Sequence, residues 1–174
     1  MLNAVTFQPF KRYIRKVSDF RLFYREHRNR LFAYLMRSTG DYYLSGDILQ
    51  ESFTRYLEKY GEEAPKPALL YTIARNAVVD GHRRKGRETP LSDAQDHSRH
   101  NPETHMMVNE DYRRVLEGMQ GLERGERDIL SLVVSSGLPY RDIARIAGTS
   151  EANVKVRVHR ARAKLKKIMD TGDI

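Results

Sequence analysis

The amino-acid sequence predicts an all-α protein with two small helical domains joined by a flexible linker, the C-terminal domain containing a helix-turn-helix. Apolar residues recur at helical spacings of three and four through most of the chain. No segment shows the apolar–polar alternation of a strand. A polar stretch at residues 87–108 contains two prolines and interrupts the helical pattern. The length of 174 residues suits one large domain or two small ones.

Four parts follow from these patterns. Residues 1–18 form a basic extension with no assigned role, and residues 19–86 form a helical domain that breaks near Gly40 and between residues 61 and 67. Residues 87–108 are the linker, and residues 109–174 form the second helical domain. No motif defines how the two domains lie relative to each other.

The first domain begins with two amphipathic patterns. Within residues 19–37 the predicted core positions are Phe20, Phe23, Tyr24, His27, Leu31, Tyr34 and Leu35. Within residues 47–60 they are Leu49, Phe53, Tyr56 and Tyr60, with Ile48 and Leu57 widening the apolar stripe. Both patterns predict helices that bury one face.

The helix predicted at residues 47–60 also carries a continuous polar, mostly acidic stripe. Its members are Asp47, Gln50, Glu51, Thr54 and Glu58. Such a stripe fits a solvated helix face, and it equally fits a docking surface for a basic partner helix. The spacing alone leaves both interpretations open.

The helix predicted at residues 68–84 has two different faces. One is apolar and core-facing, with Leu70, Ile73, Ala77 and Val78. The other combines cations, an amide and aliphatic carbon, with Thr72, Arg75, Asn76, Val79, His82 and Arg83. Such a mixture is typical of a surface that contacts DNA.

The segment from Arg141 to Lys167 predicts a helix-turn-helix. This motif needs a small residue where its helices meet, a residue that tolerates left-handed backbone in the turn, and an aliphatic residue in the second helix. Ala144, Gly148 and Val154 fill these positions, and Ser150 can cap the second helix.

The second helix of this motif has a core stripe and an outward face at its start. The core stripe comprises Val154, Val158, Ala161, Leu165 and Ile168. The outward residues are Asn153, Lys155, Val156, Arg157 and Arg160. Because the start of a recognition helix enters the major groove, these five side chains are the predicted base and phosphate contacts.

Composition favours an anionic partner and gives no sign of an enzyme. The chain has 31 Lys and Arg against 23 Asp and Glu, a net charge of +8, and no cysteine. No nucleophile–base motif or phosphate-binding glycine loop is present. His97, His100 and His105 lie in the linker without a carboxylate scaffold. We therefore expect no enzymatic activity, no cofactor, no metal site and no membrane insertion.

Both halves together resemble the extracytoplasmic-function (ECF) sigma factors of the sigma-70 family. In the first half the resemblance rests on DILQESFTRYLEKY (47–60) and ALLYTIARNAVVDGHRRKGR (68–87). In the second half it rests on LERGERDILSLVVSSGLPYRDIARIAGTSEANVKVRVHRARAKL. It implies a sigma region 2-like domain at 19–86 and a region 4-like domain at 109–174, in a cytoplasmic protein that starts transcription.

The resemblance also implies partners and residue roles. Asp47, Gln50, Glu51 and Thr54 would dock on the β′ subunit of core RNA polymerase, which also contributes its β subunit as a partner. The minus-ten promoter element would meet Arg75, Asn76, Asp80, Arg83 and Arg84. The loop at 61–67 would capture a flipped-out base, and the helix-turn-helix would read the minus-thirty-five element. An anti-sigma factor is an expected further partner.

The chain departs from the family pattern at several positions. Leu69 stands where the family has tryptophan, and Glu123 where proline is frequent. Ala152 and Asn153 replace a usual Gly-Thr pair, so promoter preference is expected to differ. A dimeric helix-turn-helix repressor is the main alternative function, since the second half alone also resembles output domains of LuxR-type regulators.

Overall fold

The computed structural model describes residues 7–61, 65–87 and 110–171. Within these ranges the chain is helical, and no strand is found in the described part, which confirms the predicted all-α class. Of the described residues, the N-terminal part forms α1 (Phe7–Thr39), α2 (Tyr42–Tyr60) and α3 (Pro67–Arg87), the last ending at the first residue of the predicted linker. The described residues after the linker form α5 (Glu110–Gln120), α6 (Arg124–Ser135), α7 (Tyr140–Ala147) and α8 (Glu151–Thr171). Residues 88–108 of the predicted linker lie outside the described residues.

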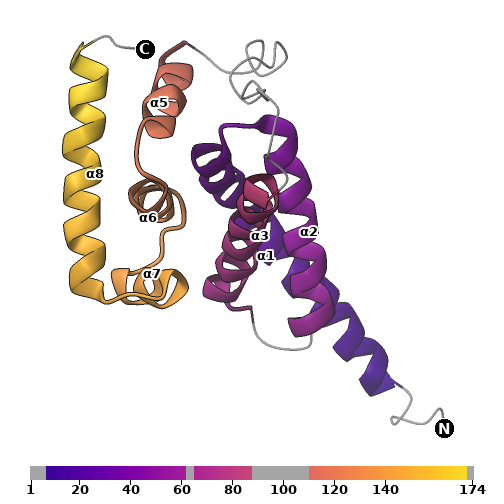
Figure 1. Ribbon diagram of the computed structural model, residues 1–174. Coiled ribbons are helices and arrows are strands. Elements are labelled where there is room, and N and C mark those ends of the chain that lie inside the picture. The colour runs from indigo at the N-terminus through magenta and orange to yellow at the C-terminus, as the bar shows by residue number, and fades with distance from the viewer. Residues whose placement is uncertain (1–6, 62–64, 88–109, 172–174) are drawn as a thin grey trace, which may run out of the picture.

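Helices α1, α2 and α3 pack against one another around an aromatic-rich core (Figure 1). Tyr34, Tyr56 and Tyr71 are among its largest fully buried side chains. The predicted core positions Phe23, His27, Leu31, Leu35, Ile48 and Phe53 are also buried. Burying this much aromatic and aliphatic surface provides the main driving force for assembling the three helices.

Leu57 does not widen the buried stripe of α2, contrary to the sequence prediction. Its side chain is 46% exposed, whereas Tyr56 beside it is 2% exposed. One residue step turns a helix by about 100°. Leu57 therefore lies beyond the arc of α2 that α1 and α3 cover.

The breaks between the first three helices follow from local chemistry. Gly40 ends α1 with a positive φ of 71°, which glycine adopts without strain. Asp41 caps α2, because its carboxylate accepts a 2.9 Å hydrogen bond from the amide of Leu44. The Tyr56 hydroxyl accepts a 2.8 Å hydrogen bond from the amide of Lys66 just before α3 begins. The orientation of α3 is thereby tied to α2.

The start of α1 differs from the sequence analysis. The helix begins at Phe7, inside the basic extension of residues 1–18 that the sequence left unassigned. Pro9 falls in the first turn of this helix, where backbone amides have no intrahelical acceptor. A proline there does not interrupt a helix.

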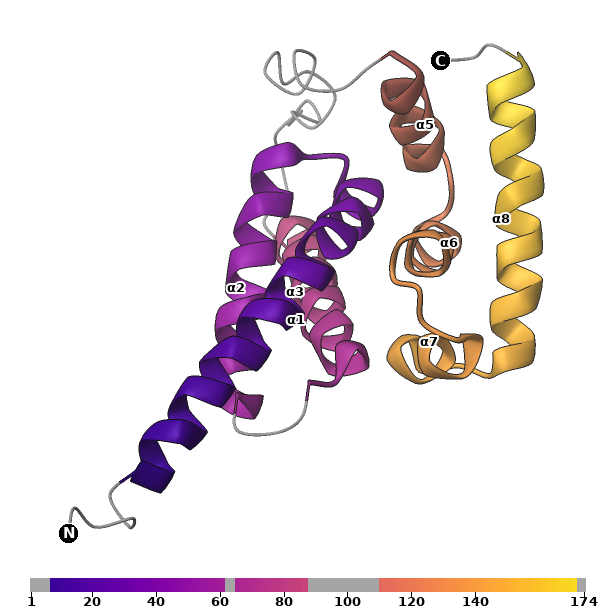
Figure 2. The same cartoon turned by 180° about the vertical axis from the view of Figure 1, so that it is seen from behind.

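Helices α5–α8 pack on one another, and their buried residues belong to the same hydrophobic cluster as those of α1–α3. Helix α8 contacts α5, α6 and α7 (Figure 2). The predicted stripe of α8 is buried at Val154, Val158 and Ala161, while Leu165 and Ile168 are half-buried. Leu132 of α6 and Ile143 of α7 are fully buried. These helices confirm the helical class predicted for this part of the chain.

The turn between α7 and α8 has the predicted helix-turn-helix chemistry. Gly148 adopts left-handed backbone with φ 63° and ψ 41°. The Ser150 hydroxyl accepts a 3.2 Å hydrogen bond from the amide of Asn153, as a helix cap does. The positions assigned to Ala144, Gly148, Ser150 and Val154 are all confirmed.

The two groups of helices contact each other, an arrangement that no sequence motif defined. Helix α1 packs against α6 and α5, and α3 packs against α7. The two groups therefore lie side by side in both views of the molecule (Figures 1 and 2). Among the described residues, no helix combines the length and hydropathy that crossing a membrane requires.

Candidate functional site

The acidic stripe of α2 forms one open depression on the protein surface. Asp47, Gln50, Glu51 and Thr54 line it together with Arg55. The opposite side of the helix carries buried Ile48, Phe53 and Tyr56, which fixes the direction in which the stripe points. The structure thus brings all four predicted docking residues together on one accessible face.

Local contacts shape the charge of this face. Arg55 pairs with Glu51 one turn earlier at 2.6 Å, and both side chains are about half exposed. The Thr54 hydroxyl donates to the Gln50 carbonyl within the helix. Asp47 lies exposed at the other end of the depression. Two carboxylates against one guanidinium leave the face with an acidic balance.

The predicted DNA-facing side of α3 is only partly accessible. Asn76, Val79 and Asp80 are exposed. Arg75 is 24% exposed, and its Nε donates to Asp128 Oδ2 of α6 at 2.7 Å. Arg83 and Arg84 fall within the span of α3, but their side chains lie outside the described residues. Of the predicted DNA-contacting residues, Asn76 and Asp80 are therefore exposed together, whereas Arg75 contacts Asp128. Residues 62–64 of the predicted base-capturing loop also lie outside the described residues.

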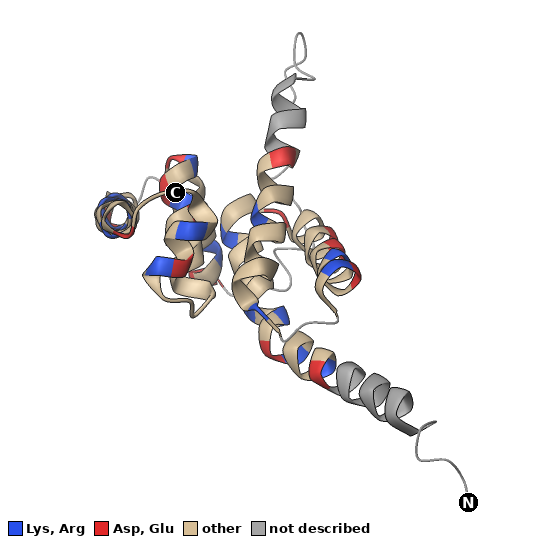
Figure 3. Cartoon of the chain, turned by 90° about the horizontal axis from the view of Figure 1, so that it is seen from below, with Lys and Arg blue, Asp and Glu red and all other residues tan. Residues whose placement is uncertain are grey.

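The predicted outward face of α8 is accessible. Lys155 and Arg160 are exposed and Val156 is 46% exposed, whereas Asn153 and Arg157 are half-buried. The side-chain amide of Asn153 donates a 2.6 Å hydrogen bond to the Thr149 hydroxyl. Most of the charged residues of α8, which Figure 3 shows end-on, are Lys or Arg. All five residues lie in the first three turns of the helix that follows the helix-turn-helix turn.

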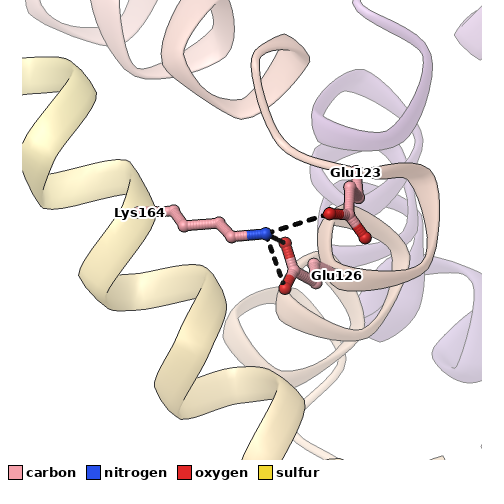
Figure 4. A network of polar contacts seen from close by, with 3 residues as sticks. All are labelled: Glu123, Glu126 and Lys164. Carbon is pink, nitrogen blue, oxygen red and sulfur yellow. Dashed lines mark hydrogen bonds and ion pairs between the residues drawn. The ribbon is translucent and has the colours of Figure 1, made fainter.

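One cation of the basic run in α8 has a structural role. Lys164 Nζ donates to Glu126 Oε2 at 2.9 Å and to Glu123 Oε1 at 3.1 Å (Figure 4). These hydrogen bonds, chiefly the one to Glu126, raise the pKa of Lys164. Glu126 is buried, so the contact also satisfies a carboxylate with little access to water. Lys164 thus holds α8 against the start of α6.

Sequence reasoning missed Asp128, which joins the two groups of helices. Its carboxylate accepts a 2.9 Å hydrogen bond from the Tyr34 hydroxyl on α1 as well as the bond from Arg75 on α3. Burial, reinforced by Asp128, raises the pKa of Tyr34 well above its ordinary value, so the phenol keeps the proton that it donates. No local signal marks this contact, because its partners are 94 and 53 residues away.

Further polar contacts surround Asp128. Arg75 also donates to the carbonyl of Ile146 near the end of α7, at 3.3 Å. Arg37 of α1 donates to the Ser135 hydroxyl of α6 at 3.1 Å. The side-chain amide of Gln120 donates to the carbonyl of Arg37 at 3.2 Å. The contact between the two groups of helices is therefore rich in directional hydrogen bonds. No cluster of His, Asp and Glu suited to a metal ion occurs in the described ranges.

Comparison with known proteins gives the class of protein that this fold and these surfaces define. The family description "Sigma-70 region 2" matches residues 23–88. The description "Sigma-70, region 4" matches residues 112–165. The two matches lie in the two groups of helices, on either side of the predicted linker.

Full-length relatives narrow the class. The chain is 31% identical over 154 residues to the ECF RNA polymerase sigma factor SigM of Bacillus subtilis, covering 86% of this chain and 94% of that protein. It is 28% identical to EcfG of Rhodopseudomonas palustris over 80% of this chain and 78% of that protein. It is 33% identical to SigL of Mycobacterium tuberculosis, over 81% of this chain and 83% of that protein. The chain belongs to the ECF RNA polymerase sigma factors of the sigma-70 family.

Two solved structures share the fold. RpoE of Bartonella quintana, solved with the anti-sigma factor NepR, aligns with a TM-score of 0.70 and 22% identity, over 87% of this chain and 97% of that one. CnrH, solved with the cytosolic domain of CnrY, aligns with a TM-score of 0.63 and 24% identity, over 87% of this chain and 88% of that one. The resemblance drawn from the sequence is thereby confirmed, together with the prediction of a promoter-directing sigma factor. A match in both halves disfavours the dimeric repressor.

Proposed function

We propose that this sigma factor docks on core RNA polymerase through α2 and reads promoters through α3 and α8. The observation that carries the proposal is the separation of three surfaces of different chemistry on three helices. Each of the three helices buries the face opposite to its proposed contact surface, and this burial fixes the direction in which the contact residues point. The described side chains give an acidic surface on α2 and a basic surface on α8, while α3 exposes Asn76 and Asp80; these suit one protein partner and two DNA segments.

The acidic depression on α2 is the proposed contact with the clamp helices of the β′ subunit. Asp47, Gln50, Glu51 and Thr54 line it and are exposed. A basic helix would find two carboxylates and two polar side chains within a few turns. Complementary charge of this kind speeds association and suppresses wrong partners.

The exposed side of α3 is the proposed contact with the minus-ten element. Arg75, Asn76, Asp80, Arg83 and Arg84 are the assigned residues. Guanidinium groups hold phosphate or base oxygens with two parallel hydrogen bonds, and an amide can pair with adenine. Asp80 adds an acceptor suited to a cytosine amino group.

The start of α8 is the proposed contact with the minus-thirty-five element. Lys155 and Arg160 supply positive charge, which binds DNA by releasing counterions from phosphate. Asn153, Val156 and Arg157 supply an amide, a methyl-contacting surface and a guanidinium for base edges. A good bidentate base contact contributes about 1–3 kcal/mol of discrimination.

Mounting both DNA-reading surfaces on one polymerase raises their effective concentration at a promoter without any new contact. This division of labour makes the protein a transcription initiation factor and not an enzyme, acting in the cytoplasm with core polymerase. Two structural neighbours were solved with the anti-sigma factor NepR and with part of CnrY. We propose that a protein of the anti-sigma type also restrains this chain.

The test combines transcription with a pair of charge-matched variants. Purified cognate core polymerase and the full chain are incubated with a promoter library, and transcripts are sequenced. Asp47→Arg is expected to weaken polymerase retention in a pull-down by at least about tenfold, because like charges across an interface cost several kcal/mol. Asp170→Arg makes the same charge change at an exposed position near the end of α8 and is expected to retain polymerase.

Two results would count against the proposal. Unchanged polymerase retention by Asp47→Arg would remove α2 as the docking surface. Absence of promoter-dependent transcripts with the wild-type chain, combined with tight binding of a palindromic operator as a dimer, would favour the repressor instead.

A further inference from the structure

We propose that the outer face of α1, together with the start of α2, binds a single strand of DNA. The surface has two parts, an arginine stripe on α1 and an aromatic corner where α1 meets α2. The arginine stripe comprises Arg21, Arg25 and Arg28, and the aromatic corner comprises Phe32, Tyr42 and Tyr43. None of these residues belongs to the surfaces proposed to contact polymerase, the minus-ten element or the minus-thirty-five element. The protein would therefore have a third nucleic-acid surface, beyond the two of its proposed function.

Helical spacing places the arginine stripe on the outside of the molecule. Its arginines and Phe32 recur at intervals of four, three and four residues, so they are neighbours on one face of the helix. Arg25 and buried Tyr34 are about two and a half helical turns apart, which puts them on opposite sides of α1. Helix α1 lies behind α2 and α3 in Figure 1 and in front of them in Figure 2, so no described helix covers its outer side.

The positive charge of the arginine stripe is not neutralised by the described part of the chain. All three arginines are exposed, and no carboxylate within the described ranges forms an ion pair with them. The Nε of Arg28 donates to the side-chain carbonyl of Asn29 at 3.2 Å, and this partner is uncharged. Glu26 follows Arg25 in the sequence but lies about 100° around the helix from it. The guanidinium groups are therefore available to phosphate oxygens, which they bind with paired donors.

The aromatic corner adds a surface on which bases can stack. The rings of Phe32 and Tyr42 meet edge to face with centroids 5.4 Å apart, and those of Tyr42 and Tyr43 do so at 5.7 Å. Tyr43 is 51% exposed, although an aromatic side chain gains free energy by burial. The carboxylate of Asp41 beside this corner accepts a hydrogen bond from the amide of Leu44 as the cap of α2. Its charge is thus compensated by the start of the helix.

The combination of the two parts favours a single strand of nucleic acid. Proteins bind such strands with a positively charged track for the backbone and aromatic rings for the bases. In a duplex the bases stack on one another, so a duplex can use the arginines but not the rings. A basic partner helix, which the acidic depression on α2 attracts, is repelled by the arginine stripe. The opened strand of a promoter supplies both phosphates and unstacked bases.

Two substitutions test the two parts separately, and each has a matched control. Arg25→Ala removes one cation of the arginine stripe, whereas Arg114→Ala removes the same group from an exposed position on α5. Tyr43→Ala removes the exposed ring, whereas Tyr43→Phe keeps the ring and removes only the hydroxyl. All three positions are exposed, so the fold is expected to persist, and circular dichroism checks this.

Binding of the full chain to a fluorescein-labelled single strand of DNA is measured by fluorescence anisotropy at several salt concentrations. Arg25→Ala is expected to weaken binding and to reduce the slope of log affinity against log salt by about 0.7, the share of one phosphate contact. Tyr43→Ala is expected to weaken binding by about fivefold or more, the effect of losing one stacked base. Both controls should match the parent. Equal affinities of Arg25→Ala and Arg114→Ala, or of Tyr43→Ala and Tyr43→Phe, would overturn the proposal.

A duplex of the same sequence and a pull-down with core polymerase distinguish the single strand from other partners. Tyr43→Ala is expected to bind the duplex as the parent does, because paired bases do not stack on the ring. Arg25→Ala and Tyr43→Ala are expected to retain polymerase, unlike Asp47→Arg. Loss of polymerase retention in both, with unchanged affinity for the strand, would assign this surface to polymerase instead. Since Asp47→Arg tests docking through α2 independently, failure of the single-strand surface would leave the proposed function intact.

Discussion

Helices α3 and α8 have the same length of 21 residues and carry the two proposed DNA-reading surfaces, yet the rest of the molecule treats them differently. Helix α8 packs through one stripe and leaves Val156 46% exposed on its outward side. Helix α3 packs on its own core and also contacts α7, and its Arg75 pairs with Asp128 of α6. Arg75 is therefore held by a carboxylate of the other group of helices, whereas Lys155 on the outward face of α8 pairs with Glu151 of its own helix at 3.4 Å and stays 63% exposed.

The largest effect by which this comparison can be tested is expected in the buried stripe of α8. Val154 is fully buried, whereas Val156, two residues further on, is 46% exposed. Val154→Asp is expected to lower the free energy of unfolding of the C-terminal helices by about 3–5 kcal/mol, because an unpaired charge is buried. Urea unfolding followed by circular dichroism measures the loss.

Val156→Asp is the matched control, since it introduces the same side chain on the exposed side of the same helix. It is expected to change stability by less than about 0.5 kcal/mol. Equal destabilisation by the two variants would show that α8 does not have one buried and one free face.

A smaller effect concerns the turn that sets the direction of α8. Gly148 has φ 63°, and an added Cβ would meet no atom within 4 Å. Gly148→Ala is therefore expected to cost about 1–2 kcal/mol from left-handed backbone alone. Thermal unfolding of the variant and the parent measures this cost.

Gly46 provides a control with the opposite sign. It lies within helix α2, and an added Cβ there also meets no atom within 4 Å. Gly46→Ala is expected to stabilise the chain by about 0.5–1 kcal/mol, because alanine has the higher helix propensity. If Gly148→Ala also stabilised the protein, the turn would not need left-handed backbone.

Local features were predictable from the sequence because local chemistry determines them. Gly148 and Ser150 took their predicted roles, since turn conformation and capping depend on neighbouring residues. Leu57 was predicted on the apolar stripe but is exposed, because spacing does not say how wide an arc the neighbouring helices cover. The Tyr34–Asp128 contact could not be predicted, because its partners are 94 residues apart and belong to different groups of helices.

The same distinction applies to the candidate surfaces. The acidic stripe of α2 could be read from the sequence, because one helix supplies all its residues and helical spacing alone places them together. The engagement of Arg75 could not, because a carboxylate on another helix decides it. Sequence pattern thus identifies which side chains share a face, while tertiary contacts decide whether that face is free.

The smallest expected effect is a pH dependence that distinguishes the N-terminal core from α8. His27 is buried beside Phe23, and this burial lowers the pKa of its imidazole below the ordinary value. Because the folded protein binds this proton less readily than the unfolded chain, His27 contributes stability above about pH 6.5 that is lost as the pH falls. The free energy of unfolding is expected to fall as the pH drops below about 6.5, with a slope below about 1.4 kcal/mol per pH unit for one proton.

Two glutamine variants test the source of this slope. His27→Gln should flatten the dependence, since it removes the titrating group, although the variant itself is expected to be less stable. His159→Gln, at an exposed position on α8, should leave the slope unchanged. Urea unfolding at closely spaced pH values measures both. A slope that persists in His27→Gln and disappears in His159→Gln would reverse the comparison, because the pH-sensitive packing would then lie in the helices that carry the exposed surface.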